Sequence, residues 1–224
     1  MIASVRFWLI AILTSLILTP CDSADATDAK NIWETTIVKF EEQDRQQMPA
    51  EGGIVFVGSS SIRLWDLEES FPEWKTINRG FGGSQASDSA YYAERIVVKY
   101  KPRLVVFYAG DNDLALGKSP EQVRDDIARF TTKIRTSLPD CKVILLSIKP
   151  SGSRWNLRSK QSKANELMKE LALSDPHLQF IDVGRLLLGP DGRPRSELFL
   201  PDQLHLNADG YRLWAQALLT HLKE

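Results

Sequence analysis

The chain has 224 residues, of which 43% are hydrophobic and 25% are charged, and its formal net charge is −1. This length suits one α/β domain, and the composition is ordinary for a globular protein. The near-neutral charge, with no basic stripe, argues against a nucleic-acid partner.

The beginning of the chain has the pattern of an export signal. Arg6 is followed by the apolar run FWLIAILTSLIL at residues 7–18. The run is too short to span a bilayer, which takes about 20 residues, but it has the length of a signal-peptide core. Small residues that suit cleavage follow, up to Ala26. We therefore expect a signal peptide at 1–26, a mature domain at 27–224 and no membrane span after cleavage.

Such a signal implies a secreted, periplasmic or cell-envelope protein. An uncleaved anchor helix and lipidation at Cys21 are the alternatives. If Cys21 leaves with the signal, Cys141 stands alone, so the sequence provides no disulfide framework. Cys141 opens an apolar run and is expected in the core. The spacing of Cys and His residues that a metal site needs is absent, so we expect no metal.

After the signal, apolar and helical patterns alternate along the chain. Trp33, Ile37 and Phe40 have helical spacing. Later helical patterns lie at 86–100, 120–137, 159–174 and 207–222. Apolar runs typical of strands buried on both faces lie at 53–57, 103–109, 142–148 and 178–183, and a weaker one at 75–78. This order predicts one domain of the α/β class, a three-layer α/β/α sandwich around a five-stranded parallel sheet.

Polar segments follow these strands on one edge of the predicted sheet, where ligands bind in open parallel sheets. They are GSSS at 58–61, NRGFGGS at 78–84, GDND at 110–113 and, before the last helix, DQLHLN at 202–207. Each segment alone has a structural explanation as a turn or a helix cap. Their coincidence on one edge favours a catalytic site.

The residue types at this edge fit nucleophilic catalysis. A serine hydroxyl needs an adjacent base, usually His, and the His needs a carboxylate that fixes its tautomer. Asp202 and His205 are three residues apart, so one turn can point both side chains the same way. An oxyanion needs positioned N–H donors, which the backbone at Gly83 and the amide of Asn112 could supply.

These residues, in this order, resemble the four signature blocks of the SGNH hydrolases, also called the GDSL esterase/lipase family. The blocks supply Ser60, Gly83, Asn112 and His205, and the sequence is most similar to the platelet-activating-factor acetylhydrolase branch. The resemblance implies a flavodoxin-like SGNH hydrolase fold. It also implies that Asp202 and His205 form a triad with Ser60, and that the oxyanion hole consists of the Ser60 and Gly83 N–H groups and the Asn112 side chain.

The resemblance also selects one of three adjacent serines. The family's first block reads Gly-Asp-Ser, which places the nucleophile at Ser60, with Ser59 and Ser61 as alternatives. Ser59 stands where the family usually has Asp, so any contact of that Asp is in doubt here. Asp111 and Asp113 are interpreted as turn and scaffold residues.

The expected activity is hydrolysis of a carboxylic ester through an acyl-enzyme, without a metal or an organic cofactor. The absence of a long apolar insertion favours a short acyl group such as acetyl, on a small-molecule or glycan ester. Arg154, Trp155 and Arg158 are candidates for the pocket rim, where Trp155 could stack on a sugar. The alternative is that Trp155 packs under its loop while the arginines are solvated.

Other functions remain open at this stage. A lysophospholipase or thioesterase would use the same residues. A carbohydrate-binding module that does not cleave its ligand would be supported by a lost triad residue, and none is lost. An interaction protein would leave the four blocks unexplained. The sequence does not settle the oligomeric state.

Overall fold

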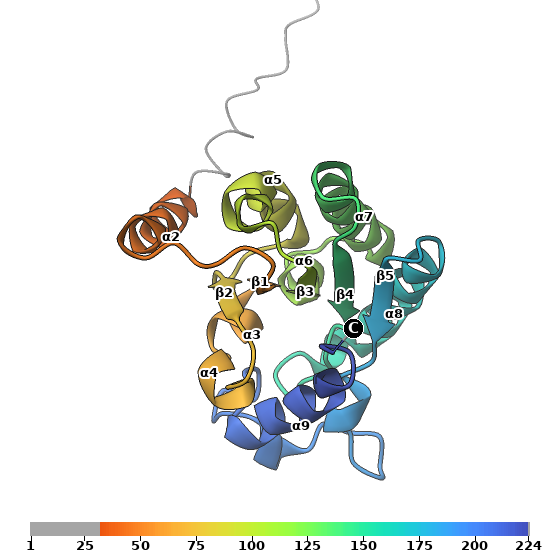
Figure 1. The fold of residues 1–224 in the computed structure, drawn as a ribbon. Helices are drawn as coiled ribbons and strands as arrows, with labels where there is room; N and C mark the ends of the chain where they lie inside the picture. Colours follow the sequence, from red (N-terminus) through yellow and green to blue (C-terminus); the bar gives the residue numbers. More distant parts are fainter. Residues whose placement is uncertain (1–31, 224) are drawn as a thin grey trace, which may run out of the picture. The chain divides into compact units, whose positions relative to one another are not determined.

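Five parallel strands form the central sheet of the computed structural model, which describes residues 32–223. The order across the sheet is β2-β1-β3-β4-β5 (Figure 1). The strands are β1 (Ile54–Gly58), β2 (Thr76–Gly80), β3 (Leu104–Tyr108), β4 (Lys142–Leu146) and β5 (Leu178–Ile181). This is the flavodoxin-like order, so the predicted fold class is confirmed. The predicted signal peptide lies outside the described residues.

Helices cover both faces of the sheet (Figure 1). One layer contains α2 (Glu34–Gln46), α5 (Ala86–Ile96), α7 (Pro120–Ser137) and α8 (Arg158–Leu173). The other contains α3 (Ser60–Arg63), α4 (Leu67–Ser70) and α9 (Ala208–Leu219). Alternate residues of β1 enter the two cores: Val55 and Val57 pack with the first layer, Ile54 and Phe56 with the second. Burial on both faces explains why the strands read as continuous apolar runs.

The predicted strands and long helices all exist, with boundaries shifted by a few residues. The predicted helix 86–100 ends at Ile96 and continues as a 3₁₀ turn at Val98–Tyr100. Cys141 is free and buried, as expected. Between residues 32 and 223, no helix has the length and apolar character that crossing a bilayer requires.

Strand register brings the polar turns together at one edge. Gly58, at the end of β1, lies in register with Gly80 of β2 and with Tyr108 of β3. The three strands therefore end at the same level. The segments that follow them, which hold the predicted serine, glycine and asparagine, start side by side at the point where the strand order reverses.

Candidate active site

Ser60 opens the first turn after β1. The turn needs a glycine before it, because Gly58 has a φ of +142° and a Cβ there would lie 1.9 Å from the Tyr108 carbonyl oxygen. Ser59 and Ser61 are buried, whereas Ser60 is half-buried at the start of α3. Of the three serines, Ser60 is the one that contacts the histidine, with its Oγ 2.9 Å from His205 Nε2.

The histidine comes from the loop before α9. His205 Nδ1 lies 2.6 Å from Asp202 Oδ2, which completes a hydrogen-bonded chain from Asp202 through His205 to Ser60. Asp202 Oδ1 accepts hydrogen bonds from the backbone N–H groups of Leu204 and His205. Desolvation opposes ionisation of Asp202, but the hydrogen bonds from His205 and Leu204 outweigh it and lower the pKa of the carboxyl to about 2. Asp202 is therefore a carboxylate at neutral pH.

Gly83 follows β2 in an exposed turn with a φ of +83°, a conformation that side chains disfavour. A Cβ at this position would lie 3.2 Å from the ring of Trp33, so the indole packs directly over the glycine. Trp33 also donates from Nε1 to the Asp88 carboxylate at the start of α5. Within residues 32–223, neither the Ser60 N–H nor the Gly83 N–H donates a hydrogen bond, so both are free for a substrate oxygen.

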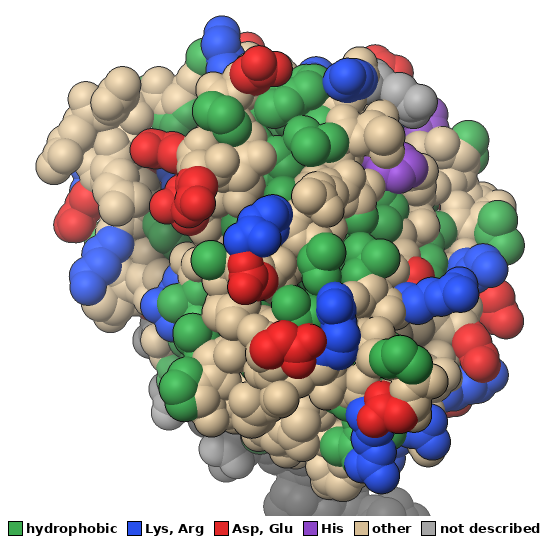
Figure 2. Space-filling view, turned by 90° about the horizontal axis from the view of Figure 1, so that it is seen from below, with side chains coloured by type: hydrophobic (Ala, Val, Ile, Leu, Met, Phe, Trp, Pro, Cys, Tyr) green, Lys and Arg blue, Asp and Glu red, His purple; other side chains and the backbone are tan. Residues whose placement is uncertain are grey.

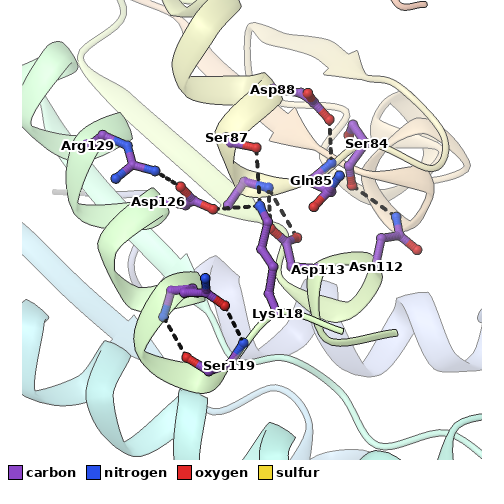
Figure 3. A network of polar contacts seen from close by, with 12 residues as sticks. Ser84, Gln85, Ser87, Asp88, Asn112, Asp113, Lys118, Ser119, Asp126 and Arg129 are labelled. Carbon is purple, nitrogen blue, oxygen red and sulfur yellow. Dashed lines mark hydrogen bonds and ion pairs between the residues drawn. The ribbon is translucent and has the colours of Figure 1, made fainter. Parts of the chain in front are cut away.

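The Asn112 amide is held at both ends. Asn112 lies in α6 (Asp111–Ala115), directly after β3. Its Nδ2 donates to the Ser84 carbonyl at 3.0 Å, and its Oδ1 accepts from the Arg154 guanidinium at 3.0 Å (the first contact is drawn in Figure 3). The amide orientation is fixed by these two contacts, and one N–H of Nδ2 remains for a ligand.

A buried ion network lies behind the Asn112 helix (Figure 3). Asp113 is fully buried, and both of its carboxylate oxygens accept from the Ala86 N–H. Lys118 pairs with Asp113 at 2.9 Å and with Asp126 at 2.6 Å, and it also donates to Ser87. The network ties α6 and α7 to the start of α5, just beyond the turn that carries Gly83.

A second charged cluster lies on the other side of Asn112. The Asp111 carboxylate accepts from Arg154 at 2.9 Å and from Gln161 at 3.1 Å, and Lys149 Nζ lies 3.8 Å from it. Lys149 is almost completely buried, and this desolvation lowers the pKa of its amine. The cluster anchors the Arg154 guanidinium that holds Asn112.

The three predicted rim residues occupy different settings. Arg154 points to Asn112 and Asp111. Trp155 is half-buried, with the guanidinium groups of Arg158 and Arg193 over its ring at 5.0 and 5.1 Å from the centroid. Two cations thus already lie where a sugar face would stack.

Sequence reasoning missed several residues around the site. Nothing in the sequence indicated a role for Lys118 or Lys149, except that each lies a few residues after a polar turn. Trp33 was assigned only to a helical pattern. Arg154 was a candidate for the rim, not a partner of Asn112. Each of these contacts joins segments far apart in the sequence, which local patterns do not reveal.

An apolar groove of about 470 Å³ adjoins the histidine loop, between α4 and α9. Leu64, Leu200 and Leu206 are among its lining residues, and Leu206 directly follows His205. Figure 2 looks from below onto the side that carries α4 and α9 and shows apolar surface interrupted by charged side chains. Within the described part of the chain, no group of three or more His, Cys, Asp or Glu residues could hold a metal ion.

Comparison with known proteins matches the model of the GDSL-like lipase/acylhydrolase family to residues 63–213. The match starts three residues after Ser60 and includes Gly83, Asn112, Asp202 and His205. The platelet-activating factor acetylhydrolase IB subunit alpha1 of Bos taurus is 28% identical over 174 residues, which cover 75% of this chain and 74% of the relative.

Two solved structures illustrate the similarity of fold. A protein of Streptococcus pneumoniae, described as a candidate platelet activating factor, has a TM-score of 0.76 and 21% identity, covering 90% of this chain and 100% of its own. A catalytic mutant of an acetylxylan esterase from Geobacillus stearothermophilus has a TM-score of 0.61 and 16% identity, covering 77% and 95%.

Proposed function

We propose that this chain is a serine esterase that works through Ser60, His205 and Asp202. The chain belongs to the GDSL-like lipase/acylhydrolase family and is an ester hydrolase of the SGNH type. The observation that carries the proposal is the continuous hydrogen-bonded chain Asp202–His205–Ser60, with distances of 2.6 and 2.9 Å. Its connectivity is the one that activates a serine hydroxyl, since the carboxylate orients the base and the base contacts the nucleophile.

In the first half of the reaction, Ser60 Oγ attacks the ester carbonyl while His205 Nε2 accepts its proton. The carbonyl oxygen becomes an oxyanion that receives hydrogen bonds from the free N–H groups of Ser60 and Gly83 and from Asn112 Nδ2. His205 then gives the proton to the departing alcohol. The Asp202 carboxylate stabilises the imidazolium formed in between.

In the second half, water attacks the acyl group on Ser60, and His205 accepts the proton of that water. Collapse of the second oxyanion breaks the bond to Ser60 Oγ, which takes its proton back from His205, and the carboxylic acid leaves. Asp202 is about half exposed and His205 about one fifth exposed, so water can reach this side of the site.

We further propose a short acyl group, such as acetyl, on a small-molecule or glycan ester. The segments that follow β1, β2 and β3 are short, which favours an open site. Names of similar proteins include an acetylhydrolase and an acetylxylan esterase. The apolar groove beside Leu206 supports the alternative of a longer, lysophospholipid-like substrate. The apolar run at 7–18 supports export to the cell envelope or beyond.

The test is hydrolysis of p-nitrophenyl acetate, butyrate and octanoate by residues 27–224, beside Ser60→Ala and the matched control Ser59→Ala. We expect fast acetate turnover that disappears in Ser60→Ala and persists in Ser59→Ala. A preference for octanoate would assign the longer substrate instead. Folded protein without turnover, and without labelling of Ser60 by a fluorophosphonate, would refute the serine esterase and favour a binding module.

A further inference from the structure

A second pocket lies on the β4–β5 side of the site, at the same edge of the sheet. It has a volume of about 370 Å³ and is lined in part by Pro150 after β4, Gly184 after β5 and the first turn of α8. Trp155 forms part of its wall. Arg154 directly precedes Trp155 and contacts Asn112, one of the proposed oxyanion donors. The pocket wall at Trp155 therefore adjoins, in the sequence, a residue that contacts the catalytic site.

Three guanidinium groups surround this pocket. Arg158 and Arg185 line it, and Arg193 lies over the ring of Trp155 next to the lining residue Gly192. Among residues 32–223, none of these three arginine side chains has a carboxylate partner. Arg154, by contrast, is paired with Asp111.

The acidic group at the pocket is already engaged. Asp182 lines the pocket, and its Oδ1 accepts from the Ser147 hydroxyl and from the Arg185 backbone N–H. Asp191, next to Gly192, accepts from the Arg193 backbone N–H. Counting Asp182 and Asp191 against the three arginines leaves an excess of one positive charge. The first turn of α8 adds no acidic residue, and the N-terminus of a helix itself favours an anion.

One buried polar atom also lacks a partner here. Gln161 lines the pocket and is almost completely buried, with its Nε2 bonded to Asp111 and the Lys149 carbonyl. Its Oε1 has no hydrogen-bond partner. A buried acceptor left unpaired is costly, but this oxygen is closed to solvent and is therefore not a contact for a ligand in the pocket. The contacts that the pocket offers a ligand are therefore the guanidinium groups, which fit an anionic group.

We propose that this pocket binds an anionic group, a carboxylate, sulfate or phosphate, on the alcohol part of the ester. The inference rests on the proposed function, because an acetyl group has no room for a charge and the alcohol must then carry it. Guanidinium groups suit these anions, since their planar N–H forks match the oxygens in pairs. The substrate class is therefore an ester of an alcohol that carries an anionic group.

Binding can be tested without turnover. In full-length Ser60→Ala with ¹⁵N-labelled tryptophan, the Trp155 indole signal is identified by Trp155→Phe and followed during titration at constant ionic strength. The titrants are sulfate, phosphate, benzoate and neutral benzamide. We expect saturable shifts with the anions and none with benzamide, and at least about tenfold weaker binding in Arg185→Gln/Arg193→Gln. The order of the affinities for sulfate, phosphate and benzoate then indicates which of the three anionic groups the pocket prefers.

Turnover gives the second test, with 4-acetoxybenzoate and 4-acetoxybenzamide as charged and neutral esters. We expect the ratio of their kcat/KM values to favour the benzoate and to fall about tenfold in the double variant. The control Arg45→Gln/Arg124→Gln, which removes the same charge from distant surface pairs, should keep the ratio. Equal kcat/KM values together with no Trp155 shift would overturn the anion pocket. Loss of turnover on both esters would refute the esterase instead, and the titration would still decide the pocket.

Discussion

The two sides of the candidate active site are built differently. The oxyanion side, around Asn112, is supported by buried charges: Asp113 is fully buried and paired with Lys118, and the amide is held by Arg154. The acid–base side, around His205, is a partly exposed loop held by hydrogen bonds within itself and by one from the Ser153 N–H to the Gln203 carbonyl, without a buried ion pair to any of residues 32–223. Electrostatic stabilisation needs donors fixed before the reaction, whereas proton transfer needs access to water. The difference in construction follows that division of tasks.

The comparison predicts that changes on the loop side affect chemistry more than stability. In Asp202→Asn, the new Oδ1 can still accept from the Leu204 and His205 N–H groups, so the loop keeps its shape. The new Nδ2 cannot accept from His205 Nδ1, which leaves the wrong tautomer. We expect kcat to fall by about 10³- to 10⁴-fold with a nearly unchanged melting temperature. Asp209→Asn, at an exposed position in the first turn of α9, is the control and should retain activity.

The pKa of Asp202 also gives a pH test in the wild type. The depressed pKa of Asp202, about 2, means that its charge is present above that pH and is lost only as the pH falls through it. Well above that pH the wild-type carboxylate stays ionised, so protonation of Asp202 cannot cause a loss of kcat/KM there, and an acid limb in that range belongs to another group. An acid limb near pH 2 would contradict the assignment of His205 as the base.

On the oxyanion side, removal of one donor should slow the reaction at almost constant substrate binding. Asn112→Ala removes the amide that is held between Ser84 and Arg154. We expect kcat to fall by about 10²- to 10³-fold, with a small change in KM, because the contact strengthens in the transition state. If Asn112→Ala raised KM and left kcat unchanged, Asn112 would contribute to binding of the substrate and not specifically to the transition state.

The buried network should control stability more than chemistry. Lys118→Met leaves Asp113 buried without its cation. Since Lys118 is about one quarter exposed, we expect a loss of about 2 to 3 kcal/mol in the free energy of unfolding, below the range for fully buried pairs. Arg129→Met is the matched control: Arg129 also pairs with Asp126 but is mostly exposed, so its loss should cost less than about 1 kcal/mol.

The loss should also depend on pH. Desolvation raises the pKa of Asp113, and Lys118 opposes that shift, so Lys118→Met raises the pKa further. Above the ordinary value of 3.8, the folded state then keeps a proton that the unfolded state has lost, and stability falls as the pH rises. Lys118→Met should therefore be less destabilised at pH 4.5 than at pH 7 in denaturant titrations. An equal loss at both values would show that Asp113 is not the group left unpaired.

This contrast also separates what the sequence predicted from what it could not. The strands were evident because burial on both faces gives continuous apolar runs, and parallel strands place Ser60, Asn112 and His205 at one edge. The supporting residues escaped prediction, because Lys118 and Arg154 look like ordinary surface charges until tertiary structure pairs them. The short helix α6 was read as a turn, since five residues carry no periodic pattern.

The smallest predicted effect tests whether Arg154 acts through Asn112. Arg154→Ala removes the guanidinium that holds the amide oxygen, and we expect kcat to fall about tenfold, the worth of one charged hydrogen bond. A general structural role would give the same loss in any background. A positioning role predicts that Arg154→Ala costs almost nothing once Asn112 is already Ala, so the double-mutant cycle should be strongly non-additive. Additive losses would show that Arg154 and Asn112 act independently and that the oxyanion side is less rigid than its contacts indicate.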